Sequence, residues 1–185
     1  SHGSWNSAWI RGNHSAAERE RRIVVVKVMI VEDQPMVRLA MEQYLASGKC
    51  YQTVASISNA AMAEAVCRKC GADLILMDIC TEEDESGLAA AKKIKKALPW
   101  VKIVMITSMV EFGFLEKAKE AGVELFVLDD GWFGARNDDY CGLGDWYVNL
   151  EKLPSGISGL SRKVEELGLK FGLWVELEMV NKDSD

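Results

Sequence analysis

Acidic and hydroxyl side chains follow three apolar runs of this chain, at the point where each run ends. They are Glu32 and Asp33 after the first run, Asp78 after the second and Thr107 after the third. Carboxylate oxygens are preferred Mg²⁺ ligands, and an aspartate held beside that ion can accept a phosphoryl group. A single acid after a strand is usually a turn residue or a helix cap, but several at successive run ends favour a shared site.

A fourth apolar run, residues 125–128, ends in two further acids, Asp129 and Asp130. Like charges raise one another's pKa and attract cations. If the four run ends meet, the sequence therefore predicts a pocket that binds Mg²⁺ or Ca²⁺ and resists a phosphoryl anion.

The apolar runs alternate with stretches of helical length, which is typical of a βα repeat. We expect strands at 27–31, 74–77, 103–106 and 125–128, and helices at 34–47, 59–69, 87–98 and 110–121. Strands that are apolar throughout are buried on both faces, so the sheet should be parallel, with helices on each side. Because the carboxyl ends of parallel strands share one edge, the acidic residues should gather there.

Charge and composition exclude several classes of function. The net charge of -6 disfavours binding to nucleic acid or to an anionic membrane surface, and no apolar stretch approaches the ~20 residues that span a bilayer. The five cysteines form no disulfide framework, so we expect reduced thiols and a cytoplasmic protein. Cys67 and Cys70 form a CxxC pair without a second pair or a nearby histidine, which favours helix packing over zinc binding.

Three motifs carry a resemblance to a known family. Val28-Met-Ile-Val-Glu32-Asp33-Gln, Leu74-Ile-Leu-Met-Asp78-Ile and Val104-Met-Ile-Thr107-Ser108 occur in this order. Together they resemble the receiver domains of two-component response regulators, from about residue 25 to residue 126. The resemblance implies an α/β fold with a flavodoxin-like, doubly wound parallel sheet of about five strands, Mg²⁺ as cofactor and a sensor histidine kinase as partner.

The resemblance also implies roles for individual residues. These are the phosphoacceptor for Asp78, Mg²⁺ ligation for Glu32, Asp33, Asp78 and the carbonyl of Cys80, contact with the phosphoryl group for Thr107, and the movable aromatic for Phe126. Two departures from the family pattern follow. The loop 79–87 is strongly acidic and lacks the usual proline, and Asp129 stands where the family has a lysine. We therefore expect Mg²⁺ binding with weak or absent phosphorylation of Asp78.

The last third of the chain carries a second resemblance. Residues 122–181, with Asp129-Asp-Gly-Trp132 and Leu143-Gly-Asp-Trp-Tyr147, resemble the bacterial α-galactosidases, which are (βα)₈-barrel enzymes. The resemblance implies that Asp129, Asp130 and Trp132 correspond to residues of a sugar pocket. Glycoside hydrolysis requires two catalytic carboxylates, which that family carries on later strands. No complete catalytic set is therefore expected, and the chain is not predicted to be an enzyme.

The two resemblances predict the organisation of the chain. We expect a disordered or tag-like tail over 1–22, a receiver-like domain over 23–128, and a barrel-derived fragment over 129–185 packed on or extending the same sheet. The fragment should contain a long loop, a helix at about 157–167 and a strand at 170–176. The helix is expected where a receiver's last helix lies. The strand should either pair with residues 125–128 or pair with a second copy, which would form a homodimer.

A junction of this kind is best explained by an engineered chimera or a recombined gene. Three functions remain open: a phosphoacceptor module impaired by Asp129, a carbohydrate-binding remnant, and a folded hybrid without activity. The C-terminal part carries no basic recognition helix, so no role in transcription is predicted.

Overall fold

The computed structural model describes residues 24–81, 85–108, 112–138, 140–177 and 179–184. Within them lies a six-stranded parallel sheet with the order β2-β1-β3-β4-β5-β6. The strands are β1 (Val26–Val31), β2 (Tyr51–Ile57), β3 (Leu74–Asp78), β4 (Lys102–Thr107), β5 (Leu125–Leu128) and β6 (Lys170–Leu173). The predicted α/β class with a parallel sheet is confirmed. The expected tail over 1–22 lies outside the described residues.

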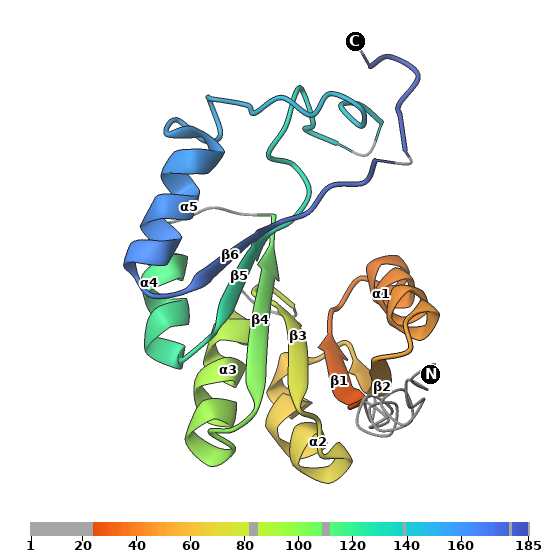
Figure 1. Cartoon of the computed structure of the whole chain (residues 1–185), viewed down its shortest axis with the longest axis vertical. Coiled ribbons are helices and arrows are strands. Elements are labelled where there is room, and N and C mark those ends of the chain that lie inside the picture. The colour runs from red at the N-terminus through yellow and green to blue at the C-terminus, as the bar shows by residue number, and fades with distance from the viewer. Residues whose placement is uncertain (1–23, 82–84, 109–111, 139, 178, 185) are drawn as a thin grey trace, which may run out of the picture.

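Helices connect the strands in regular alternation (Figure 1). They are α1 (Pro35–Ser47), the short 3₁₀ helix η2 (Ala60–Met62), α2 (Ala63–Cys70), α3 (Ser86–Ala97), α4 (Phe112–Ala121) and α5 (Gly156–Glu166). Pro35 starts α1, where its missing N–H costs no hydrogen bond. Gly71 ends α2 in the left-handed conformation, with φ 64°, which favours glycine. No described helix is long and apolar enough to cross a membrane.

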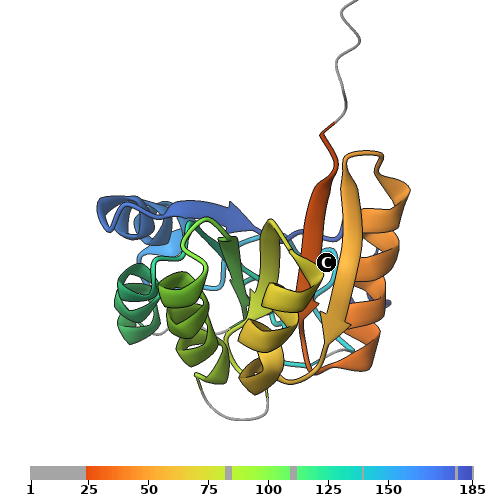
Figure 2. The same ribbon diagram turned by 90° about the horizontal axis from the view of Figure 1, so that it is seen from below.

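The two faces of the sheet differ in how well they are covered. Side chains of β1, β3, β4 and β5 on one face form a large core with α2, α3, α4 and α5. On the other face α1 covers a small core of Val28, Ile30 and Leu45, and Leu45 is the only described residue of α1 that is buried. Figure 2 shows α2, α3 and α4 side by side along one face, with α1 on the opposite side next to β2.

The C-terminal part extends the sheet of the preceding part. Strand β6 pairs with β5 in parallel, with Phe126 opposite Phe171 and Leu128 opposite Leu173. Of the two placements predicted for the final strand, pairing with residues 125–128 is therefore the one observed. The strand ends at Leu173 rather than at residue 176.

The expectation that the last helix lies where a receiver's last helix lies is wrong. Leu160 and Val164 of α5 pack into the same core as Leu115 and Ala118 of α4. The physical reason is handedness: a connection between parallel strands is right-handed, so successive outward steps from β3 to β6 place α3, α4 and α5 on one face.

Candidate functional site

Three carboxylates meet at the carboxyl edge of the sheet. The main-chain pairing of β1 with β3 sets Val31 opposite Met77, so Glu32, which follows β1, and Asp78, the last residue of β3, come side by side. Asp33 joins them from the start of the next loop. One carboxylate oxygen from each of the three lies within 4.8 Å of the others. The predicted acidic cluster is thus assembled by the register of two neighbouring strands.

The cluster is partly withdrawn from solvent. Glu32 is 5% exposed, and one of its carboxylate oxygens accepts a hydrogen bond from the main-chain N–H of Gln34 at 2.9 Å. The guanidinium of Arg38 donates to the main-chain carbonyls of Glu32 and Asp33 rather than to a carboxylate. In the described part of the chain, no ion pair to Asp78 is recorded. Among the described residues, none forms an ion pair with Glu32 or Asp33 either.

Burial and mutual repulsion raise the affinity of these acids for protons. Burial, together with the nearby charges of Asp78 and Asp33, raises the pKa of Glu32 to about 7, although the Gln34 N–H acts in the opposite direction. Burial, with the charges of Asp33 and Asp129, raises the pKa of Asp78 to about 6. A divalent cation bound among these carboxylates would reduce the repulsion between them, because it supplies positive charge.

The loop after β3 holds the Asp78 carboxylate in place. The main-chain N–H groups of Cys80 and Ile79 lower the pKa of this carboxyl and so favour its charged form, against the larger effect of burial. Gly87 at the start of α3 packs against the same segment so closely that an added Cβ would lie 1.9 Å from the main-chain oxygen of Asp78. The contribution recorded for Cys80 is its N–H, and its predicted role as a carbonyl ligand stays a prediction. Residues 82–84 of the acidic loop lie outside the described part.

The other residues expected at the site come from β4 and β5. Thr107, 4% exposed, ends β4, and its carbonyl accepts a hydrogen bond from the N–H of Asp129 at 2.8 Å. Phe126 is fully buried in β5. Burial raises the pKa of Asp129, and its charge acts on Asp78. Asp129 is therefore close enough to Asp78 to affect its protonation.

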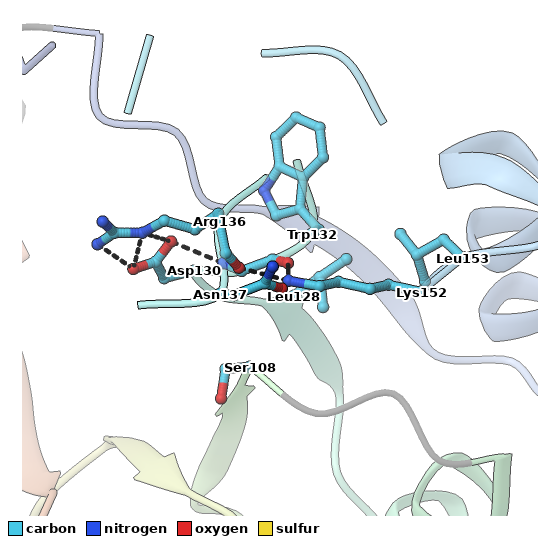
Figure 3. A pocket seen from close by; sticks show the side chains of 9 residues that line it. Ser108, Leu128, Asp130, Trp132, Arg136, Asn137, Lys152 and Leu153 are labelled. Carbon is cyan, nitrogen blue, oxygen red and sulfur yellow. Dashed lines mark hydrogen bonds and ion pairs between the residues drawn. The ribbon is translucent and has the colours of Figure 1, made fainter. Parts of the chain in front are cut away.

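The second acid after β5, Asp130, is engaged in a different way. The Arg136 guanidinium forms a bidentate ion pair with its carboxylate, with distances of 2.7 Å from Nη2 and 3.0 Å from Nε (Figure 3). Arg136 is 8% exposed and also donates to the carbonyl of Cys141. Lys152 donates to the carbonyls of Gly131 and Arg136. Arg136 and Lys152 were not predicted from the sequence, where the available signal was an arginine six residues after Asp130.

Trp132 is buried in an aromatic cluster with Phe133, Trp146 and Trp174. It is 4% exposed, and its indole N–H donates to the carbonyl of Trp174 at 3.0 Å. A hollow of about 340 Å³ lies next to it, lined also by Asp130 and Lys152 but not by Asp129. The three residues predicted for a sugar pocket therefore do not line one hollow together, and the indole packs on protein side chains.

In comparison with known proteins, the two parts of the chain match models of different families. The family model for the response regulator receiver domain matches residues 28–129, more than half of the chain. A two-component response regulator of the LuxR family from Aurantimonas sp. SI85-9A1 is 26% identical with a TM-score of 0.52, over 56% of this chain and 73% of that one. The isolated REC domain of RcsB from Salmonella enterica serovar Typhimurium, solved with the phosphomimetic BeF₃⁻, has a TM-score of 0.53. It is 20% identical, over 79% of this chain and 99% of that one, which shows likeness of fold.

The Melibiase family model matches residues 107–185 and so overlaps the end of the first match. The α-galactosidase AgaA of Geobacillus stearothermophilus is 63% identical over 68 residues, and an α-galactosidase of Escherichia coli is 53% identical over 70. These matches cover 37% and 38% of this chain but only 9% and 10% of the relatives. The chain thus spans about a tenth of the α-galactosidases that it resembles, and the predicted combination of two families is confirmed.

Proposed function

Because the chain belongs to the response regulator receiver domain family, we propose that it is a phosphoacceptor module in which Asp78 receives a phosphoryl group with the help of Mg²⁺. The observation that carries the proposal is the meeting of the Glu32, Asp33 and Asp78 carboxylates within 4.8 Å. The phosphodonor is a histidine kinase or a small acyl phosphate. Phosphorylation is slow because Asp129 adds a negative charge to the site.

The chemistry of the three acids fits Mg²⁺. The ion prefers oxygen ligands, keeps several waters, and is held in proteins by a small number of carboxylates. The raised pKa values of Glu32 and Asp78 indicate that the cluster lacks positive charge. Bound there, Mg²⁺ would neutralise charge on the incoming phosphoryl oxygens. A proton and the ion would compete for the same oxygens, so binding should strengthen as the pH rises through 6 to 7.

The residues of the chain divide the remaining work. One oxygen of the Asp78 carboxylate attacks phosphorus, and the bond from phosphorus to the donor breaks as the donor leaves with its electron pair. The N–H groups of Cys80 and Ile79 lower the pKa of that carboxyl and so favour its charged, nucleophilic form. Thr107, at the end of the neighbouring strand, lies in position to contact the phosphoryl group. Because Thr107 is buried, water competes little for its hydrogen bond to the phosphoryl group.

The acid at position 129 opposes this reaction. A phosphoryl group brings about two negative charges into a pocket where Asp129 already repels Asp78. Receivers have a lysine at this position, which attracts the phosphoryl group. We propose that Asp129 repels it instead. The module should consequently bind the metal well and phosphorylate poorly.

A role in carbohydrate binding is not favoured. The Asp130 carboxylate is taken by Arg136, and the Trp132 indole is 4% exposed. A sugar would have to break the ion pair and displace the aromatic cluster before it could reach either group.

Metal binding provides the direct test. Calorimetric titration with Mg²⁺ at pH 7.5 should give one site in the wild type, and Asp78→Asn should weaken that site at least tenfold. Asp138→Asn is the matched control, because it removes an exposed carboxylate outside the cluster and should leave the affinity unchanged. Equal affinities in all three proteins, or the absence of binding in the wild type, would show that the cluster is not a metal site.

A further inference from the structure

The hollow beside Trp132 is lined by side chains from two segments of the chain. Ser108 directly follows β4, whereas the rest of the lining comes from the end of β5 and from the loop after it. Figure 3 shows Ser108 on one side of the hollow and Asp130, Asn137 and Lys152 on the other. With a volume of about 340 Å³, the hollow is at the lower end of the range for small-molecule sites, about 300–1,000 Å³. The volume therefore suits a ligand with few heavy atoms.

The acid in the lining of the hollow is already neutralised. Arg136 holds the Asp130 carboxylate in the bidentate pair, with distances of 2.7 Å from Nη2 and 3.0 Å from Nε. Because Arg136 is 8% exposed, this pair is a fixed part of the wall, and the two parallel hydrogen bonds give it a defined geometry. A ligand could reach the guanidinium or the carboxylate only by breaking the pair.

The charge of Lys152 is not neutralised in the same way. Its ammonium donates to the main-chain carbonyls of Gly131, at 2.8 Å, and of Arg136. These bonds hold the ammonium at the hollow and use two of its three N–H donors, but a carbonyl carries no net charge. Within the described part of the chain, no carboxylate forms an ion pair with Lys152. The lining thus contains one acid, Asp130, and two cations, Arg136 and Lys152, a net charge of +1 in a chain that carries -6.

We propose that the hollow binds a small organic monocarboxylate, with one carboxylate oxygen on the Lys152 ammonium. A monoanion balances the net charge of the lining, whereas a phosphate group carries about -1.5 to -2 charges near pH 7. Phosphate is also commonly bound by the fork of an arginine, and Asp130 already occupies the fork of Arg136. The amide of Asn137, which lines the same hollow, can donate to the second carboxylate oxygen.

Apolar side chains in the lining favour a ligand with a short alkyl chain. Leu128, Trp132 and Leu153 are 0%, 4% and 5% exposed, so they form a fixed apolar wall next to the ammonium. Small-molecule sites typically combine such a wall with a few polar groups. Because an ion pair with an exposed lysine is weak, we expect a dissociation constant of about 1–10 mM. The proposal is independent of phosphorylation, because the lining includes none of the three acids of the metal cluster.

Titration of the full, nitrogen-labelled chain with butyrate at constant ionic strength, followed by NMR, tests the proposal. Trp132 lines the hollow and its indole N–H donates to the carbonyl of Trp174, so the signal of this N–H reports binding, and Trp132→Phe assigns it. Trp100, 66% exposed and outside the hollow, is the reference in the same molecule. We expect a saturable shift of the Trp132 signal and none of the Trp100 signal. The neutral analogue butyramide should bind at least threefold more weakly than butyrate, and inorganic phosphate should also bind more weakly.

Substitution of the lysine should weaken the site. Lys152→Met removes the charge but keeps most of the alkyl stem, and it should weaken butyrate binding at least threefold. The matched change Lys96→Met removes an exposed ammonium of α3 outside the hollow and should leave the affinity unchanged. If Lys152→Met does not fold, the comparison of butyrate with butyramide in the wild type decides alone. The absence of a saturable Trp132 shift, equal binding of butyramide, tighter binding of phosphate, or wild-type affinity in a folded Lys152→Met variant would each overturn the proposal.

Discussion

Replacing Asp129 by lysine should restore phosphorylation of Asp78. The change converts a negative charge into a positive one beside a carboxylate whose pKa burial and neighbouring acids raise to about 6. At an effective dielectric constant near 20, one unit charge about 5 Å away is worth about 3.3 kcal/mol, so two units amount to about 6.6 kcal/mol before screening. Screening by water and salt at a partly exposed group reduces this severalfold, to about 1–3 kcal/mol. Each 1.36 kcal/mol corresponds to about tenfold, so we expect a ten- to hundredfold faster reaction.

The assay is an intact-mass time course with acetyl phosphate and Mg²⁺ at pH 7.5. The wild type should accumulate the phosphoryl adduct slowly, Asp129→Asn at an intermediate rate, and Asp129→Lys fastest. Removal of Mg²⁺ with a chelator should abolish the adduct in all three proteins. The graded order matters, because it separates an effect of charge from an effect of side-chain shape.

Two controls make the outcome decisive. Asp138→Lys introduces the same change of charge at an exposed site and should leave the rate at the wild-type value. Asp129→Lys with Asp78→Asn should give no adduct. If Asp129→Lys reacts no faster than Asp138→Lys while its thermal unfolding remains cooperative, repulsion by Asp129 is not what limits the reaction. Rapid and complete phosphorylation of the wild type would lead to the same conclusion.

Three further predictions concern stability. Burial raises the pKa of Glu32 from 4.5 to about 7, so the stability linked to its proton is present below pH 4.5 and is lost as the pH rises to 7. Glu32→Gln cannot lose this proton. Without divalent ions, its free energy of unfolding in urea should therefore exceed that of the wild type by roughly 1–3 kcal/mol at pH 8 but not at pH 4.5. An equal difference at both pH values would argue against the raised pKa. Gly87→Ala should lower the melting temperature by several degrees because its Cβ would meet a main-chain oxygen at 1.9 Å, while Gly113→Ala, with nothing within 4 Å, should stabilise by about 0.5–1 kcal/mol. Similar melting temperatures for these two variants would exclude the predicted clash. Arg136→Met leaves the partly buried Asp130 carboxylate without its ion-pair partner and should lower the free energy of unfolding in urea by roughly 1–3 kcal/mol. Adding Asp130→Asn in the same chain should restore most of that loss. If the double variant is as unstable as Arg136→Met, the arginine stabilises the fold through another contact.

The acidic cluster could be predicted because it depends on local rules. Apolar runs that end in acids give parallel strands, and their carboxyl ends share an edge whatever lies between them. The expected strand 125–128 is observed with the same bounds, and 27–31 differs from β1 by one residue. Strand β2 was not assigned from the sequence. Five of its seven residues are only partly buried, so the continuous apolar signal of a central strand is weak there.

The placement of α5 and the state of Asp130 could not be predicted because they depend on non-local partners. A resemblance to receivers suggested the face on which their last helix lies, but in this chain a further strand follows the helix, and the right-handed connection decides the face. Likewise, a resemblance to a sugar pocket gave no reason to expect that Arg136 would occupy the Asp130 carboxylate. The wrong placement of α5 came from transferring the position of a receiver's last helix without the strand β6 that decides it.

The register of β5 with its two neighbours has a consequence for how new proteins arise. Val104 pairs with Leu125 on one side and Leu125 with Lys170 on the other, and both pairings use main-chain groups alone. Because a main-chain ladder does not depend on which side chains its strands carry, a βα unit that resembles one family can continue a sheet that resembles another, provided that its helix packs into the same core, as α5 does. Replacing residues 125–173 by another βα unit should therefore give a folded protein when its first strand is apolar and its helix can pack beside α4, which makes this edge of the sheet a place where units of different families can be combined.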